Sequence, residues 1–179
     1  MKTTQVLIAG FGGQGILFAG KFLAYKGLME DLQVSWLPSY GPEMRGGTAN
    51  CSVILSEEPV GSPIITVPDV LIAMNLPSLQ KYVDAVAPGG QIYVDSALID
   101  AKVERTDVEV FYIPATQMAK DNGIPTLANM IILGHVLENH PELSFEGVDT
   151  VIGKLVPPKK AALVELNQKA MDLGKNFKA

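Results

Sequence analysis

The segment with the clearest chemical potential is Gly10-Phe11-Gly12-Gly13-Gln14-Gly15, which satisfies the pattern G-x-G-x-x-G. It lies between an apolar run, 6–9, and a helical stretch, 16–28, so it has the strand–turn–helix context that this motif needs. Glycines let the backbone approach a diphosphate, and the N-terminus of the following helix presents N–H groups and partial positive charge. The sequence therefore predicts a phosphate-binding turn with the candidate cofactor-binding residues Gly10, Gly12, Gly13, Gln14 and Gly15. A tight turn that serves only helix–strand packing is the alternative.

A second candidate segment is the stretch from Ser39 to Cys51, which contains three glycines and one proline. Ser39 and Arg45 complete the set of candidate binding residues, because a guanidinium binds a phosphate or carboxylate through two parallel hydrogen bonds. For Arg45, an exposed salt bridge to Glu43 is an equally good alternative. Cys51 lies on the apolar side of its strand-like segment, which favours core packing over a reactive thiol.

No acidic residue follows the second strand-like segment, which ends in Leu37-Pro38-Ser39-Tyr40. Nicotinamide dinucleotide sites usually hold the ribose with an Asp or Glu at that place, about 20 residues after the glycines. Glu30 and Asp31 precede the segment, at its wrong end. The pattern therefore disfavours NAD and remains compatible with another anionic ligand.

The sequence offers no self-contained catalytic or metal site. Asp95 is the one carboxylate at the end of a predicted strand, and we expect it to cap the following turn rather than act as a general base. Neither His135 nor His140 falls at a strand end, so no nucleophile is paired with a base and no third metal ligand is evident. Cys51 is the only cysteine, which excludes an internal disulfide and a four-cysteine iron–sulfur cluster within this chain. Redox chemistry would therefore need a dissociable cofactor or a partner chain.

The composition predicts a single globular domain over residues 1–179. The chain is 47% hydrophobic, and its 14 Lys and Arg against 19 Asp and Glu give a net charge of −5, which argues against nucleic-acid binding. No apolar run approaches the ~20 residues of a membrane helix, and the N-terminus has no signal-peptide pattern. We expect a cytoplasmic protein that does not bind membranes.

Short β-rich runs alternate with longer helical stretches, which predicts an α/β fold: a Rossmann-like, mainly parallel sheet with helices on both faces. A short antiparallel hairpin is the variant left open, because no helix separates the strand at 33–37 from a half-buried strand at 48–56. Further strands are expected at 69–74, 91–94 and 108–113, and helices after Asn75 and at 116–122, 126–139, 145–155 and 158–177.

Three motifs together, Gly10 to Gly15, Ser39 to Cys51 and Val70 to Leu79, resemble the gamma subunit of 2-oxoacid:ferredoxin oxidoreductases. The likeness covers nearly the whole chain and is closest to the 2-oxoglutarate and branched-chain types of this pyruvate, 2-oxoglutarate and 2-oxoisovalerate family. It implies a multi-subunit enzyme that converts a 2-oxoacid and coenzyme A to acyl-CoA and CO₂ and passes electrons to ferredoxin.

The resemblance also implies how the cofactors and partners are distributed. Thiamine diphosphate and the 4Fe-4S clusters are expected on alpha, beta and ferredoxin-like delta subunits, while this chain assists coenzyme A binding or active-site closure. The chain indeed lacks a Gly-Asp-Gly segment followed by paired asparagines, the usual thiamine diphosphate signature. Arg45 is then a candidate phosphate contact for coenzyme A.

Two other functions and one structural question stay open at this point. A stand-alone NAD(P)-binding oxidoreductase and a nucleotide-binding regulatory module are the alternative functions. The last helix carries an apolar seam typical of a coiled coil, for which packing on the chain's own sheet is the favoured interpretation over a partner contact. The seam consists of Leu163, Leu166, Ala170, Leu173 and Phe177.

Overall fold

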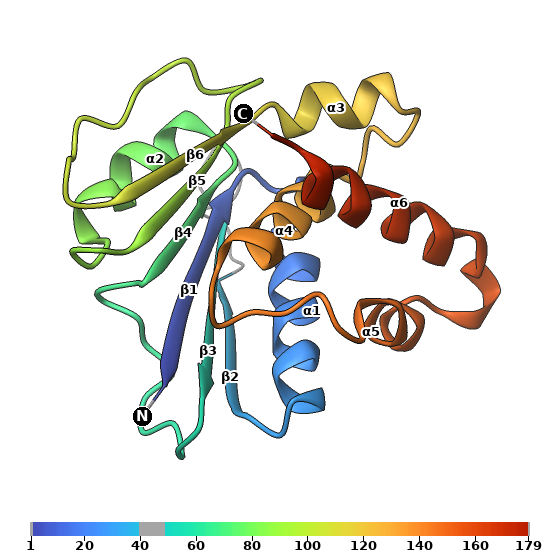
Figure 1. The fold of residues 1–179 in the computed structure, drawn as a ribbon, viewed down its shortest axis with the longest axis horizontal. Coiled ribbons are helices and arrows are strands. Elements are labelled where there is room, and N and C mark those ends of the chain that lie inside the picture. Colours follow the sequence, from blue (N-terminus) through green and yellow to red (C-terminus); the bar gives the residue numbers. More distant parts are fainter. Residues whose placement is uncertain (1, 40–48, 179) are drawn as a thin grey trace.

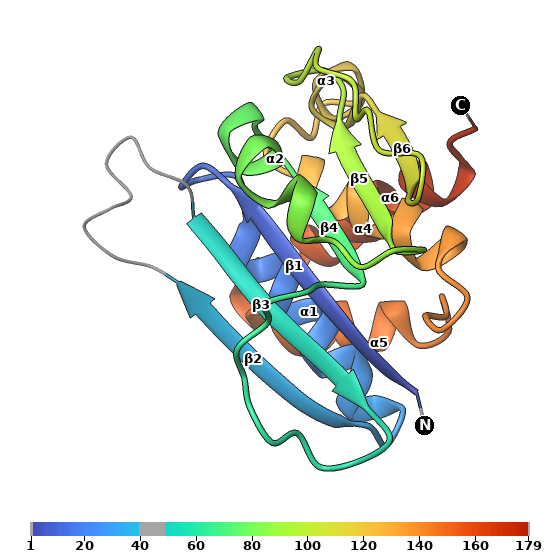
Figure 2. The same cartoon turned by 90° about the vertical axis from the view of Figure 1, so that its left-hand side faces the viewer.

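A six-stranded sheet with the order β2-β3-β1-β4-β5-β6 forms the centre of the protein. The structure is a computed structural model, and it describes residues 2–39 and 49–178. Figure 2 shows the sheet face, with β1 and β4 near its middle and β2 and β6 at its edges. The strands are β1 (Thr3–Gly10), β2 (Gln33–Ser39), β3 (Ala49–Ser56), β4 (Val70–Ala73), β5 (Gln91–Asp95) and β6 (Glu109–Ile113).

Strand β3 is the one described strand that runs against the others. It pairs antiparallel with both β2 and β1, whereas β1, β4, β5 and β6 pair in parallel. Strand β2 therefore points the same way as β1. This arrangement confirms the predicted α/β fold with a mainly parallel sheet, and the hairpin left open by the sequence exists as β2–β3.

Helices cover both faces of the sheet, as predicted, but unequally. Figure 1 shows α1, α4, α5 and α6 on one side and α2 on the other. The side chains of β1 alternate accordingly, since Val6 and Ile8 belong to the larger core and Leu7 to the smaller one. The helices are α1 (Ile16–Met29), α2 (Leu76–Tyr82), α3 (Ala115–Asp121), α4 (Ala128–Asn139), α5 (Val148–Leu155) and α6 (Ala162–Asn176), with 3₁₀ turns η2 (Val83–Ala85) and η3 (Pro158–Lys160).

The prediction of a half-buried strand at 48–56 is wrong for the part that the structure describes. Within β3, Asn50 alone is only partly buried, and even Ser52 and Ile54, on the side expected to face solvent, are buried. β3 lies between β2 and β1, so it has a paired strand on each side, and the face that carries Ser52 and Ile54 is covered as well. At its start the same side is covered from α2, because Asn50 Nδ2 donates to the Tyr82 hydroxyl at 3.1 Å.

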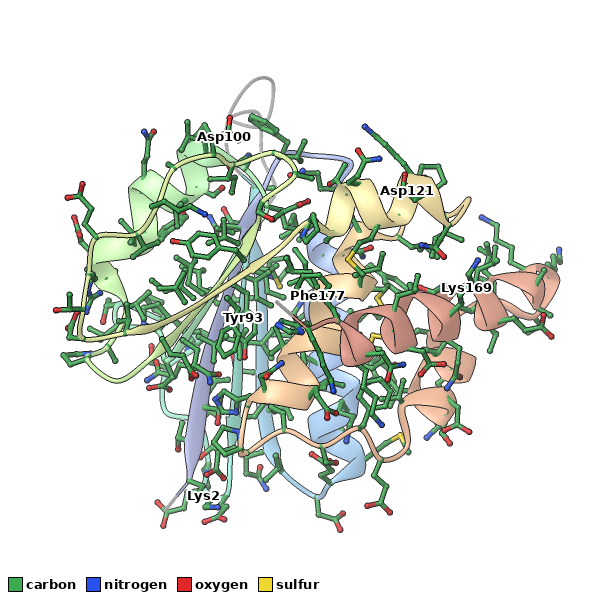
Figure 3. The ribbon with its side chains drawn as sticks, turned by 45° about the horizontal axis from the view of Figure 1, so that its top comes forward. Lys2, Tyr93, Asp100, Asp121, Lys169 and Phe177 are labelled. Atoms are coloured by element: carbon green, nitrogen blue, oxygen red, sulfur yellow. The ribbon has the colours of Figure 1, made fainter. Side chains whose placement is uncertain are left out.

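Helix α6 packs within its own chain, but against α4 rather than against the sheet. Ala170 and Met171 are fully buried there, and Gly134 of α4 and Gly174 of α6 let the two backbones touch. The C-terminal end of α6 reaches the sheet layer through Phe177, whose ring centroid lies 5.6 Å from that of His135. His135 in turn packs edge-on against Tyr93 of β5. Figure 3 labels Tyr93 and Phe177, the two aromatic residues that His135 connects.

The predicted apolar seam of the last helix is divided between core and surface. Leu163 and Leu166 are about 37% and 38% exposed, Ala170 is buried, and Leu173 and Phe177 pack partly against the core. Among the described helices, none has the length and apolar character needed to cross a bilayer.

Candidate functional site

The glycine turn connects the end of β1 to the start of α1, as the sequence predicted. Gly13 and Gly15 have φ angles of 90° and 74°, a left-handed conformation that other residues rarely adopt. A Cβ atom at Gly15 would also lie 2.8 Å from Cγ of Asn129. These two glycines are therefore required by backbone geometry, whether or not a ligand is bound.

The N-terminus of α1 is open in a way that suits an anion. No side chain caps it, and its first turn contains no acidic residue. The aligned peptide dipoles of a 14-residue helix place partial positive charge at this end. A hollow of about 270 Å³ adjoins it and is lined by Phe11, Gly12, Gly13, Gly15, Ile16, Leu17, Phe18 and Ala49.

Both polar atoms of the Gln14 side chain make hydrogen bonds within the chain, so they do not face a ligand. Its Oε1 accepts from the backbone N–H of Phe11 at 2.6 Å, and its Nε2 donates to the carbonyl of Met74 at 2.9 Å. A Cβ atom at Gly10 would lie 2.5 Å from Gln14 Oε1, so the missing side chain at Gly10 makes room for this amide. Gly12, Gly13 and Gly15 line the hollow, whereas Gly10 and Gln14 support the turn from behind.

Asn129 is a site residue that the sequence analysis missed. It lies in the first turn of α4, is 3% exposed, and donates from Nδ2 to the carbonyl of Gly15 at 3.1 Å. Its Oδ1 has no hydrogen-bond partner among the described residues. The signal in the sequence was a polar amide at the start of a mostly apolar stretch, residues 128–137.

Ser39 and Arg45 do not join the turn in the described structure. Ser39 ends β2, where it is exposed and stands opposite Asn50 of β3, while Gly10 stands opposite Ala49 of β3. Ser39 is thus two strand spacings, roughly 9–10 Å, from the end of β1. Arg45 lies outside the described residues.

The inserted strand also changes the argument about the ribose carboxylate. That argument took the segment 33–37 as the neighbour of the first strand, but β3 separates β2 from β1. A carboxylate at the end of β2 would therefore not stand beside the glycine turn. With this strand order, the absence of an acid at the end of β2 is therefore not evidence about the ligand.

Asp95 acts as a cap, as predicted. It is fully buried at the end of β5, where its carboxylate accepts hydrogen bonds from the backbone N–H groups of Ala97 and Thr116 and from the Thr116 hydroxyl. These bonds fix the loop after β5 and the start of α3. Asp95 has no free face for proton transfer.

Cys51 fills the core, which confirms the favoured interpretation. It is fully buried on β3, and Trp36 Nε1 donates to its Sγ at 2.9 Å. Burial raises the pKa of the thiol to about 11 despite this hydrogen bond. In the described part of the chain, no three His, Cys, Asp or Glu side chains come together to hold a metal ion.

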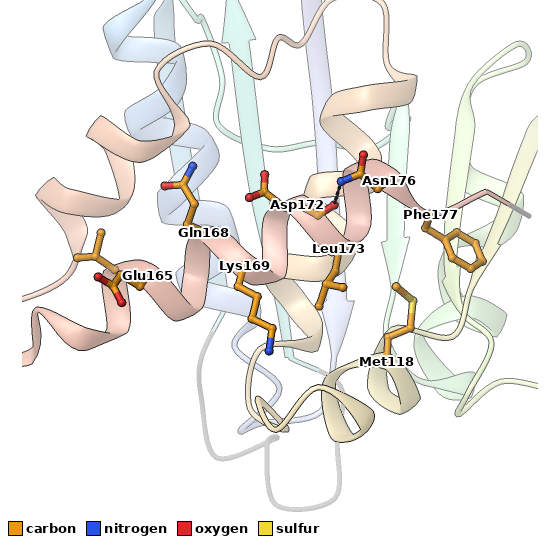
Figure 4. Close-up of a pocket in the computed structure, with 9 residues that line it drawn as sticks. Met118, Glu165, Gln168, Lys169, Asp172, Leu173, Asn176 and Phe177 are labelled. Atoms are coloured by element: carbon orange, nitrogen blue, oxygen red, sulfur yellow. Dashed lines mark hydrogen bonds between the residues drawn. The ribbon is translucent and has the colours of Figure 1, made fainter.

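A second hollow, about 670 Å³, lies between α3 and α6 and is lined by none of the predicted site residues that the structure describes. Figure 4 shows Met118 of α3 and Leu173 of α6 pointing into the space between the two helices. Lys169 ties the two sides together, because its Nζ donates to the carbonyl of Asn122 at 2.9 Å. The hollow is lined by Met118, Val164, Glu165, Gln168, Lys169, Asp172, Leu173, Asn176 and Phe177.

The fold and the glycine turn define a Rossmann-like α/β domain with an open helix N-terminus, and the family comparison makes the class of protein specific. Residues 5–177 match the family described as pyruvate ferredoxin/flavodoxin oxidoreductase. The chain therefore belongs to this family, and the resemblance seen in the sequence is confirmed.

Three relatives show the two contexts in which this domain occurs. A ketoisovalerate oxidoreductase subunit, VorA of Methanothermobacter thermautotrophicus, is 46% identical over 130 residues, which are 73% of this chain and 27% of VorA. The gamma subunit of a keto/oxoacid ferredoxin oxidoreductase from Geobacter sulfurreducens superposes with a TM-score of 0.80 and 31% identity, covering 96% of this chain and 95% of that one.

The third is 2-oxoglutarate:ferredoxin oxidoreductase from Magnetococcus marinus, solved with 2-oxoglutarate, coenzyme A and succinyl-CoA bound. It superposes with a TM-score of 0.86 and 26% identity over 99% of this chain and 32% of that chain. The chain thus spans about a quarter of VorA and a third of the Magnetococcus enzyme, but nearly all of the Geobacter subunit.

Proposed function

We propose that this chain is the gamma subunit of a multi-subunit 2-oxoacid:ferredoxin oxidoreductase. The enzyme would convert a 2-oxoacid and coenzyme A into acyl-CoA and CO₂ and pass two electrons to ferredoxin. The observation that carries the proposal is the end-to-end correspondence with the Geobacter gamma subunit, supported by the family match over residues 5–177. The family match does not support the alternatives of a stand-alone NAD(P)-dependent enzyme or a regulatory module.

The residues of the chain favour a supporting role within such a complex. Asp95 is used as a cap, Cys51 is buried with a raised pKa, and the sequence contains one cysteine where a 4Fe-4S cluster needs four. Iron–sulfur clusters therefore do not fit this chain. We propose that they and thiamine diphosphate, which supplies the carbanion chemistry of decarboxylation, are held by alpha, beta and ferredoxin-like delta subunits.

We propose that the turn helps to bind coenzyme A through its diphosphate. The uncapped N-terminus of α1 and the glycine backbone at Gly12, Gly13 and Gly15 suit a phosphate group, and the adjacent hollow is lined largely by apolar side chains. Its 270 Å³ is below the ~300–1,000 Å³ of pockets that enclose a whole small ligand. The chain would thus hold one part of coenzyme A, and partner subunits the rest.

The proposal is tested by purifying the affinity-tagged chain from the cell that makes it. We expect co-purification of a thiamine diphosphate protein and a cysteine-rich protein. The complex should oxidise pyruvate, 2-oxoisovalerate or 2-oxoglutarate only when coenzyme A and ferredoxin are present, and the isolated chain should be inactive. Saturable micromolar binding of NADH or NADPH to the isolated chain, measured by calorimetry, would contradict the proposal.

The role of the turn is tested in the same complex with a glycine pair. Gly13→Ala strains a residue with φ of 90°, whereas Gly153→Ala adds a methyl group to a helix position with open space around it. We expect the first change to raise KM for coenzyme A several-fold with little change in kcat, and the second to change neither. Arg45→Ala, predicted from the sequence alone, should also raise this KM, and an unchanged value would remove Arg45 from the site.

A further inference from the structure

The point where a ligand normally enters a sheet of this kind lies between β1 and β4. These neighbouring parallel strands are followed by α1 on one face and α2 on the opposite face (Figure 1). Strand order reverses at such a point, and the loops after the two strands diverge to leave a crevice at their carboxyl ends. Dinucleotides bind in this crevice in doubly wound proteins.

In this chain the side chain of Gln14 bridges that crevice. It starts from the turn after β1 and reaches the Met74 carbonyl immediately after β4, while its Oε1 accepts from the N–H of Phe11. The Met74 N–H is also used, because it donates to the Ala9 carbonyl at 2.9 Å. The Phe11 N–H and both backbone groups of Met74 are therefore satisfied from within the chain.

The α2 side of the crevice is closed in the same manner. Asn75 is 2% exposed and caps α2, accepting from the Ser78 N–H at 2.8 Å. The α1 side differs, since no side chain caps the N-terminus of that helix. On the α2 side the Nδ2 of Asn75 has no hydrogen-bond partner among the described residues, but this atom is buried. The accessible positive potential is therefore at the uncapped N-terminus of α1, beside the hollow.

We propose that Gln14 acts as a plug at the switch point, which excludes a dinucleotide from the crevice and confines phosphate binding to the hollow beside Gly12 and Gly13. The part of this proposal that places phosphate binding in the hollow rests on the proposed role of the turn in coenzyme A binding. Gly10 belongs to the same device, because any side chain there would collide with the Gln14 amide. Gln14 is accordingly a specificity-determining residue and not a ligand contact.

The test uses the ¹⁵N-labelled full chain, with inorganic pyrophosphate and NADH as probes. In the wild type we expect the Phe11 amide to be protected from hydrogen exchange, and NADH to cause no saturable shifts. Gln14→Ala should expose the Phe11 amide and bind pyrophosphate about tenfold more tightly, because the freed N–H adds a hydrogen bond to a charged acceptor. Its new shifts should appear at Gly10, Phe11 and Met74.

Two further variants keep the test decisive. Gln14→Glu retains the size of the plug and an acceptor for Phe11, so it should keep the Phe11 amide protected and bind pyrophosphate no better than the wild type. Gln117→Ala removes an exposed glutamine whose side-chain amide donates to Asp121, far from the turn in sequence, and it should change nothing. These two variants distinguish the effect of losing the Gln14 bridge from the general effect of losing a side-chain amide.

Either of two results would overturn the plug. One is pyrophosphate binding in Gln14→Ala that equals the wild type, and the other is a wild-type response to NADH at Gly10 and Met74. A different result would support the plug and contradict the proposed coenzyme A role of the turn. In that result the wild type shows no pyrophosphate response at Gly12, Gly13 and Gly15, but Gln14→Ala binds pyrophosphate more tightly. The two proposals therefore fail separately.

Discussion

Replacement of Gly174 by alanine should loosen the C-terminal helix, because two backbones touch at this glycine. A Cβ atom there would lie inside the contact distance of the Ile131 carbonyl oxygen and 2.8 Å from the Ile131 carbonyl carbon, both on α4. A side chain could rotate away from such a contact, but a helical backbone cannot. Helices α4 and α6 would have to separate by roughly 1.5 Å to restore ordinary contact distances.

The expected cost follows from two opposing effects. Overpacking a core costs up to about 3 kcal/mol, and the fixed backbone puts this site at or above that end. Alanine is more favourable than glycine inside a helix by about 1 kcal/mol. The net loss in the free energy of unfolding is therefore about 2 kcal/mol, which lowers the Tm of a chain of this size by about 4–8 °C.

Thermal and urea unfolding of the full chain measure this difference, with Gly153→Ala as the matched control. Gly153 is also helical, but a Cβ atom there meets nothing within 4 Å, so the control should gain about 0.5–1 kcal/mol from helix propensity. The two variants should move Tm in opposite directions. Equal shifts for both would refute the inferred backbone contact between α4 and α6.

Three other changes test the buried polar groups. The thiol of Cys51, with its pKa near 11, should react with a disulfide reagent at pH 8 at least ~100-fold more slowly in the folded chain than in urea, and fast native labelling would contradict its burial. Burial lowers the pKa of His135 below its ordinary value of 6.5, so the unfolded state binds more protons and the free energy of unfolding falls as pH drops below about 6.5. His135→Phe should reduce this pH dependence in urea titrations. The part that remains is due to His140, whose pKa burial also lowers. Asp95→Asn removes charge-assisted bonds to Thr116 and should cost roughly 1–3 kcal/mol in calorimetric unfolding, whereas an unchanged Tm would show that the cap is dispensable.

Local sequence patterns predicted the elements of this fold well, because each pattern depends on nearby residues. The apolar run at 6–9, the glycines and the helix after them became β1, the turn and α1. The start of α5 differs, since Gly147 adopts φ of 71° as its N-cap and the helix begins at Val148 instead of at residue 145. A positive φ at a glycine is set by the whole loop, and periodicity does not report it.

The position of β3 could not be predicted in this way. Alternation along a strand shows which side is more apolar, but not which strands lie on either edge of it. The sequence placed Cys51 correctly in the core and misjudged Ser52, whose face is covered in the folded chain, in part by Tyr82 of α2 at Asn50. Strand order depends on pairings between distant segments, and a short loop between two strands fixes only one of them.

The same distinction applies to the candidate site. The motif predicted the turn because its glycines are local requirements of the backbone. It gave no sign that Gln14 bonds to Met74, 60 residues away, or that Asn129 bonds to Gly15, 114 residues away. Polar side chains that bridge distant segments therefore remain the part of such a site that only the folded chain defines.

The two contexts of this domain place different demands on its surface. In VorA the matching segment is 27% of one longer chain, so covalent linkage holds it near the remainder at an effective concentration on the order of millimolar. A separate gamma subunit, as proposed here, has no such linkage and must stay assembled through its interface alone. Stable interfaces bury more than about 1,000 Å², so such a subunit needs a contact surface that extends well beyond the glycine turn. In the proposed complex this interface, rather than the small hollow at the glycine turn, would provide most of the contacts that hold the chain in place.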